Sequence, residues 1–181
     1  MSEKLQVAGR KLQDYFSLLG LSPGFDIDLS DLEKRYFIAQ RTFHPDRIIG
    51  KSAQARQMAI SQSMLVNTAY ETLKIPLKRA LYMLSLKGIT SDSSKPSQEL
   101  LMEIMELREE LAEAQAVSIL SELESKNTIY QKDTIAQLTQ AFDGDDFEQA
   151  AQLTTRLSYL SKIYDEIRAK KRVISEKSGK S

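Results

Sequence analysis

The only histidine of the chain, His44, stands directly before a proline and an aspartate in the segment RTFHPDRIIG. An imidazole and a carboxylate this close together could act as an acid–base pair. The sequence supplies nothing else for catalysis, because it offers no cysteine nucleophile, no metal cage and no glycine-rich phosphate loop around them. We therefore expect His44 and Asp46 to be recognition groups and assign no catalytic residue. A helical hydrolase that uses this pair is the weakest alternative.

The composition limits the other classes of function. The chain has 181 residues, of which 41% are hydrophobic and 28% charged, as in a soluble protein of one or two domains. Lys plus Arg and Asp plus Glu both number 25, so the net charge is zero. This balance argues against binding to nucleic acid or to an anionic membrane, and the short basic stretch RAKKRVISEK is expected to be a solvated helix end.

The absence of cysteine and the single histidine limit the inorganic chemistry. Disulfides, thiolate zinc sites and multi-histidine metal sites are excluded, so we expect no metal and no cofactor. No apolar run reaches the ~18 residues of a membrane span, and the first residues lack the apolar core of a secretory signal. These features predict a cytoplasmic protein.

Hydrophobic residues recur with a period of 3.6, which predicts an all-α fold. A short first helix should end at Gly20 in a left-handed cap. A second helix should begin after an N-cap at Asp28 and end before Pro45. Its apolar stripe is Leu32, Tyr36, Ala39 and Phe43. A third helix over about 52–74, with Met58, Val66, Ala69, Tyr70 and Leu73 as apolar positions, and a fourth from Pro76 to Gly88 follow.

The segment GITSDSSKPSQ, residues 88–98, is polar and rich in glycine, serine and proline, which predicts a domain boundary. Three more helices are predicted over about 97–112, 115–142 and 145–173, with DGDD as the tight connection between the last two. Long helices joined by a short turn lie antiparallel, so these three should form a bundle. The core stripe predicted for the last helix is Leu153, Leu157, Leu160, Tyr164 and Ile167.

The segments LEKRYFIAQRTFHPDR and VNTAYETLKIP resemble the second and third helices of a J-domain. In that family two antiparallel helices present His-Pro-Asp at their tip to a DnaK-type ATPase chaperone. The resemblance implies that His44, Pro45 and Asp46 bind the chaperone, with Asp46 making charge-assisted hydrogen bonds to a cation. It also implies a basic face that steers the encounter, formed by Lys34, Arg35, Arg41 and Arg47.

One pair of residues departs from the J-domain pattern. Many J-domains continue their basic run where this chain has Phe37 and Ile38. Both could pack against a neighbouring helix or domain. Alternatively, they could adapt the J-domain to one dedicated chaperone.

The fifth predicted helix carries more apolar residues than one core face needs. Leu100, Ile104, Leu107 and Leu111 suffice to pack the bundle. A second stripe, Leu101, Met102 and Met105, is accompanied by Glu106 and Glu109. An apolar patch with a charged rim is typical of a protein-binding surface, and methionine adapts well to partners. Burial of the helix on two sides is the alternative.

The segments YFSLLGL, PLKRALYMLSLKG and LMEIMELREELAEA together resemble the HscB family of J-type co-chaperones for iron–sulfur cluster assembly. This resemblance implies an L-shaped protein, with an N-terminal J-domain and a C-terminal three-helix bundle that binds the scaffold protein IscU. The J-domain would bind the specialised chaperone HscA. The implied scaffold-binding residues are Leu101, Met102, Met105, Glu106, Glu109 and, on the last helix, Tyr159.

The resulting prediction is a monomeric co-chaperone without enzymatic activity. The zinc-binding cysteine extension of eukaryotic members is absent, which favours the bacterial type. A general J-domain co-chaperone for DnaK is the nearest alternative. The predicted domain organisation is an N-terminal extension at 1–13, a J-domain at 14–88, a linker at 89–98, the bundle at 99–173 and a tail at 174–181.

Overall fold

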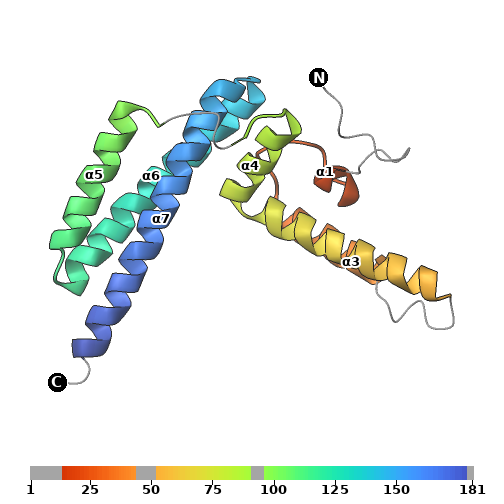
Figure 1. The fold of residues 1–181 in the computed structure, drawn as a ribbon, viewed down its shortest axis with the longest axis horizontal. Coiled ribbons are helices and arrows are strands. Elements are labelled where there is room, and N and C mark those ends of the chain that lie inside the picture. The colour runs from red at the N-terminus through yellow and green to blue at the C-terminus, as the bar shows by residue number, and fades with distance from the viewer. Residues whose placement is uncertain (1–13, 44–51, 91–95, 179–181) are drawn as a thin grey trace. The chain divides into compact units, whose positions relative to one another are not determined.

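The computed structural model describes residues 14–43, 52–90 and 96–178, and within them every regular element is an α-helix (Figure 1). This confirms the predicted all-α class. The helices are α1 (Tyr15–Leu18), α2 (Leu29–Phe43), α3 (Ala53–Lys74), α4 (Pro76–Leu86), α5 (Gln98–Glu113), α6 (Val117–Asp143) and α7 (Phe147–Ser178).

The chain divides into two compact units, Met1–Arg79 and Ala80–Ser181. The division falls inside α4, ahead of the polar segment at 88–98. The boundaries drawn from the sequence therefore stay a prediction. In the part of the chain that the structure describes, no helix is both long enough and apolar enough to cross a membrane.

Local capping sets the first two helices of the N-terminal unit. Gly20 adopts φ 67°, and the N–H of Leu21 donates to the Phe16 carbonyl at 2.8 Å, which confirms the predicted left-handed cap of α1. Asp28 precedes α2, and its Oδ1 accepts hydrogen bonds from the N–H groups of Ser30 and Asp31 at 2.8 and 3.3 Å. Asp28 is therefore the N-cap, as predicted.

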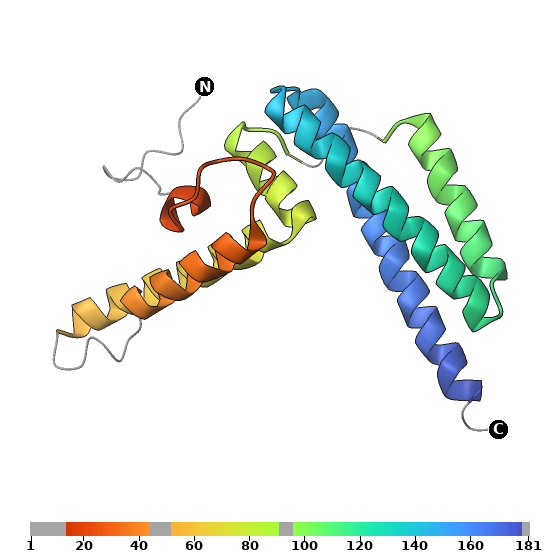
Figure 2. The same cartoon turned by 180° about the vertical axis from the view of Figure 1, so that it is seen from behind.

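Helices α2 and α3 form a hairpin, with α2 lying along α3 in both views (Figure 2). Leu32 is fully buried, and the Tyr36 ring stacks on Tyr70 with centroids 4.2 Å apart. The Tyr36 hydroxyl also donates to Asn67 Oδ1 at 3.0 Å. Leu32 and Tyr36 of the predicted apolar stripe thus face α3, and Ala39 and Phe43 of the same stripe are half-buried.

One apolar position predicted for α3 is wrong. Met58 is 50% exposed, whereas the adjacent Ala59 is buried. Since neighbouring residues on a helix differ by about 100° in direction, the inward-facing position is the one next to Met58.

A buried arginine fixes the end of the hairpin. Arg79 donates from Nε to the Leu73 carbonyl at 2.7 Å and from Nη1 to the Phe25 carbonyl at 2.5 Å. Its guanidinium also lies over the Phe25 ring. Burial lowers the pKa of Arg79, and Asp26 opposes that change. These bonds tie the loop before α2 to the junction of α3 and α4.

The C-terminal unit contains the predicted three-helix bundle, in which α6 and α7 run side by side after a tight turn (Figure 1). Asp145 of that turn has φ 55°, and Asp146 accepts a hydrogen bond from the Gln149 N–H at 3.0 Å, which caps α7. One buried cluster of its core is formed by Leu100, Ile104, Leu107, Leu111, Ala114, Leu120, Leu123, Leu160, Ile163 and Ile167. Its α5 members are the four predicted from the sequence.

One core position on α7 differs from the prediction. Tyr164 is only half-buried, and Ile163 is buried in its place with 1% exposure. The phenol of a tyrosine needs a polar environment, so a position at the edge of the core suits Tyr164 better than its centre.

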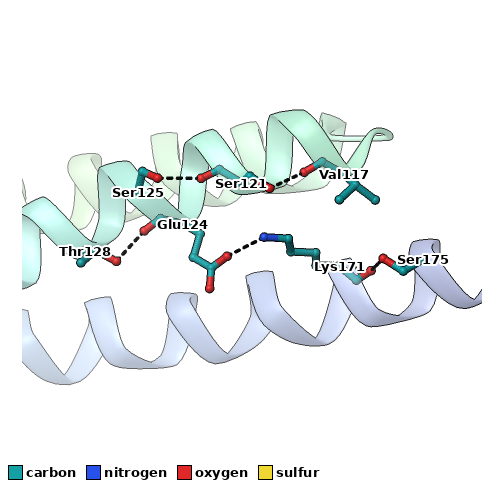
Figure 3. A network of polar contacts seen from close by, with 7 residues as sticks. All are labelled: Val117, Ser121, Glu124, Ser125, Thr128, Lys171 and Ser175. Carbon is teal, nitrogen blue, oxygen red and sulfur yellow. Dashed lines mark hydrogen bonds and ion pairs between the residues drawn. The ribbon is translucent and has the colours of Figure 1, made fainter.

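An ion pair joins the N-terminal part of α6 to the C-terminal part of α7. Lys171 Nζ donates to Glu124 Oε2 at 2.8 Å, and the two side chains point toward one another between the helices (Figure 3). The hydrogen bond from Lys171 lowers the pKa of Glu124 below its usual 4.5, against a smaller effect of burial. Because its pKa is lower in the folded protein than in the unfolded chain, this carboxylate stabilises the fold fully at a pH above its unfolded pKa. The stabilisation is lost as the pH falls through its folded pKa.

Replacement of Glu124 by glutamine should lower the free energy of unfolding by about 0.5 kcal/mol near neutral pH. The difference from the wild-type chain should vanish as the pH falls well below 4.5, because the wild-type carboxyl is then protonated as well. Urea unfolding as a function of pH measures this. Glu122→Gln, on the same helix and without an ion pair among the described residues, is the control. A difference that persisted at low pH would show that Glu124 acts through packing.

Candidate protein-binding surfaces

The outer side of α5 carries an exposed apolar stripe. Leu101, Met102 and Met105 are 43%, 57% and 61% exposed, while the core face of the same helix is buried. Within the bundle, this helix is therefore buried on one side only, and burial of its second side against the J-domain is not tested. We call these three residues the α5 patch. Patches of this kind on a helix whose core face is already complete are typical of protein-binding sites.

Carboxylates accompany the α5 patch. Glu106 and Glu109 are exposed and follow Met105 along the helix. Arg108, between them in sequence, directs a guanidinium N–H to Glu166 of α7 at 3.4 Å. The arginine is thus oriented toward the bundle, and the negative charge remains beside the patch.

Polar contacts from α7 fix α5 in place. Arg156 forms two hydrogen bonds with Glu103, from Nε at 3.0 Å and from Nη2 at 2.6 Å. Lys170 Nζ donates to the carbonyls of Leu111 and Ala112 at 2.6 and 2.9 Å, which satisfies the C-terminal end of α5. Contacts at both ends of the helix hold the α5 patch in a fixed orientation on the bundle.

Tyr159, the predicted contribution from α7, is only partly exposed. It packs against the bundle core, and the Lys162 ammonium lies 5.6 Å from its ring centroid. Part of the ring is therefore structural. The role of its exposed part in binding stays a prediction.

A groove lies between the end of α5 and the start of α6, with a volume of about 570 Å³. Its walls include Glu110 and Glu113 of α5, and Glu122 and Ile119 of α6. Lys126 neutralises Glu110 through an ion pair of 2.7 Å, and Ile119 is 46% exposed. Sequence reasoning missed this groove, because it forms only where the two helices meet.

On the N-terminal unit, the predicted basic residues have different surroundings. Lys34 and Arg41 are exposed on α2. The Arg35 side chain bonds two groups of its own unit. Its Nε donates to Asp31 Oδ2 at 2.7 Å and its Nη1 donates to the Gly20 carbonyl at 2.5 Å. Arg35 thus connects α2 to the cap of α1. The predicted contacts His44, Pro45, Asp46 and Arg47 lie outside the described residues.

Phe37 and Ile38 are also exposed, at 55% and 65%. Within the N-terminal unit neither side chain joins the core, so packing on a neighbouring helix of that unit does not explain the pair. Packing against the other domain stays a prediction. Among the described residues, no group of three or more histidine or acidic side chains is arranged to hold a metal ion.

The chain is similar to known proteins of one family. A family model described as the HSCB C-terminal oligomerisation domain matches residues 96–168. The iron-sulfur cluster co-chaperone protein HscB of Mus musculus is 38% identical over 162 residues, which cover 88% of this chain and 69% of that protein. The co-chaperone protein HscB homolog of Neisseria meningitidis serogroup A is 36% identical over 162 residues, 86% of this chain and 98% of that protein.

Solved structures agree with the sequence comparison. The crystal structure of human co-chaperone protein HscB covers 91% of this chain and 85% of its own, with a TM-score of 0.84 and 38% identity. Chaperone HscB from Vibrio cholerae covers 90% and 98%, with a TM-score of 0.79 and 36% identity. The fold is a J-domain with a helical bundle, and the chain belongs to the HscB family of iron–sulfur cluster co-chaperones.

Proposed function

We propose that the chain binds the iron–sulfur scaffold IscU through its bundle, delivers it to the chaperone HscA and stimulates the ATPase of HscA. The observation that carries the proposal is the α5 patch: three large apolar side chains that the core does not use, with carboxylates beside them. An apolar centre with a charged rim is a common composition for a protein interface.

The scaffold site consists of the α5 patch with Glu106, Glu109 and the exposed part of Tyr159. The apolar residues would supply most of the affinity, because their burial removes area from water. The carboxylates would orient a scaffold surface that carries cations, and would contribute mainly to the association rate.

The chaperone site consists of the His44-Pro45-Asp46 segment with Arg47, Lys34 and Arg41 on the same stretch of chain. Arg35 belongs to this site as well, and its guanidinium also donates hydrogen bonds to the Asp31 carboxylate and the Gly20 carbonyl. Its substitution would therefore disturb the α1–α2 connection as well as the basic face.

The mechanism needs no chemistry by this chain, no cofactor and no second copy. Binding scaffold and chaperone at once turns their encounter into an intramolecular event and raises their effective concentration. HscA performs the ATP hydrolysis. We place this activity in the cytoplasm, where a chain without cysteine is suited to a reducing environment.

The experiment that tests the proposal measures ATP hydrolysis by HscA with IscU and the chain, each alone and together. We expect the two together to stimulate more than the sum of their separate effects, and IscU to lower the half-maximal concentration of the chain about tenfold. Equal stimulation with DnaK and an unrelated client would indicate a general J-protein instead. ATP turnover by the chain alone would contradict a role without catalysis.

A further inference from the structure

The outer face of α2 carries two apolar residues between two cations. Lys34, Phe37, Ile38 and Arg41 occupy positions i, i+3, i+4 and i+7, which lie on one face of a helix. All four side chains are exposed. We call them the α2 face. Lys34 and Arg41 are separated by about 10 Å along the helix axis, with the apolar pair between them.

The fold of the N-terminal unit does not require this apolar pair. The inner side of α2 is provided by Leu32, which is fully buried, and by Tyr36, which stacks on Tyr70. Phe37 touches only the margin of that packing, with its ring 5.3 Å from the Tyr36 ring. Two adjacent large side chains left more than half exposed are better explained by a partner than by the core.

The charges around the pair define what can cover it. Neither Lys34 nor Arg41 forms an ion pair within the described residues. The pKa of Lys74 on α3 is raised mainly by its hydrogen bond with Tyr70, and the nearby carboxylate Glu33 contributes least to that rise. Among the described residues, the α2 face therefore presents two cations without an ion-pair partner, and a complementary surface must offer acidic groups on both sides of an apolar spot.

A second copy of the chain does not meet this requirement. A two-fold axis perpendicular to the helix would place Lys34 of each copy against Arg41 of the other, and an axis along the helix would place each cation against its own counterpart. Like charges directly opposite one another oppose such pairing. The occupant must be a different protein with an acidic surface.

We propose that Phe37 and Ile38 are the apolar centre of the surface that docks on the ATPase part of the DnaK-type chaperone, with Lys34 and Arg41 at its edges. This rests on the proposed function, in which α2 faces that chaperone. The pair selects a chaperone whose acidic docking surface includes an apolar spot, and it disfavours one whose surface is acidic throughout, because such carboxylates would lose water against Phe37 and Ile38 without a partner.

The proposal predicts a distinct dependence on salt. Salt screens exposed charges beyond about 10 Å at 0.1 M, whereas apolar contacts are not screened. Docking should therefore retain a salt-resistant component that comes from Phe37 and Ile38. Charge removal and apolar removal should be separable by ionic strength alone.

The test measures the concentration of the full chain that half-maximally stimulates HscA ATPase, at low and at high salt, with IscU present. The double variant Phe37→Gln/Ile38→Gln should raise this concentration about tenfold or more at both salt concentrations. Lys34→Ala/Arg41→Ala should raise it mainly at low salt. Met58→Gln/Met64→Gln removes two apolar side chains that are 50% and 64% exposed on α3 and should change nothing.

Circular dichroism and the melting temperature verify that each variant is folded. Ile38→Gln alone, which removes the more exposed member, serves as a second variant and should show a smaller loss of the same kind. Phe37→Lys/Ile38→Arg should lose stimulation of HscA and gain stimulation of DnaK.

The outcomes separate this inference from the proposed function. If the apolar variants stimulate like the wild-type chain while the Lys34/Arg41 variant is weakened, the apolar centre is wrong and the chaperone site stands. If the wild-type chain stimulates no DnaK-type ATPase, the proposed function is wrong and this inference falls with it. If the apolar variants change only the sedimentation of the chain, the face is an interface between copies and the proposal is overturned.

Discussion

Replacing Leu101, Met102 and Met105 together by alanine should weaken IscU binding about 100-fold or more. The three side chains are 43%, 57% and 61% exposed, so they are free to be buried by a partner. Loss of one such contact at the centre of an interface costs about 1–2 kcal/mol, and tenfold in affinity corresponds to about 1.4 kcal/mol. Titration calorimetry with IscU measures the change directly.

The same variant should keep its stability, because exposed side chains that contact no core change the free energy of unfolding by only about 0.5 kcal/mol. The matched control is Ile129→Ala/Val173→Ala, which removes two side chains of the same bundle that are 57% and 51% exposed. This control should bind IscU normally. A triple variant that melted far lower and still bound IscU would show that the α5 patch supports the fold and not the client.

The helices could be predicted from the sequence because their signals are local. Asp28 as an N-cap and Gly20 as a left-handed C-terminal residue each act within a few residues of their own position. A cap satisfies backbone groups of the adjacent turn whatever the rest of the chain does. Both predictions are therefore confirmed.

The direction of individual side chains was less predictable. Met58 was named among the apolar positions of the third helix, and its neighbour Ala59 is the buried one; Tyr164 was placed in the stripe where Ile163 is buried. Each error is a shift of one residue. A stripe read from one helix leaves its exact orientation free by about that amount, and the neighbouring helix decides it.

The contacts that fix the two surfaces could not be read from the sequence at all. Arg35 bonds a carbonyl 15 residues away, Arg156 a carboxylate 53 residues away and Lys170 a carbonyl 59 residues away. Nothing in the local pattern separates these cations from free ones such as Lys34. Arg35 is an example: the sequence places it only on a binding face, whereas its guanidinium also connects α1 to α2.

Within the bundle, the structure leaves the second apolar stripe of α5 outside the core. Composition alone fits both a helix buried on two sides and a helix with a binding face. The core face of α5 is complete with Leu100, Ile104, Leu107 and Leu111, and the α5 patch is left over. A binding role for the patch can thus be inferred only once it is known which side chains of α5 the core buries, and the packed structure supplies that information.

Asp46→Asn should reduce stimulation of HscA ATPase to the basal rate while leaving the affinity for IscU unchanged. Asparagine keeps the size of aspartate and removes its charge, so a charge-assisted hydrogen bond to the chaperone becomes a neutral one. Where the partner cation is desolvated, loss of the opposite charge costs about 3–5 kcal/mol, because that cation is left buried and unpaired. Steady-state ATP hydrolysis and IscU calorimetry on the same sample measure both functions.

The control is Asp133→Asn, an equally isosteric change at an exposed position of α6 in the bundle, which should stimulate normally. The comparison with the alanine triple variant is informative, since the two changes should have opposite effects on the two measurements. An Asp46→Asn chain that still stimulated HscA would contradict the chaperone site. Asp46 and the α5 patch belong to different units of the chain, so we expect the two surfaces to act independently. An Asp46→Asn chain that also lost IscU binding would contradict that expectation.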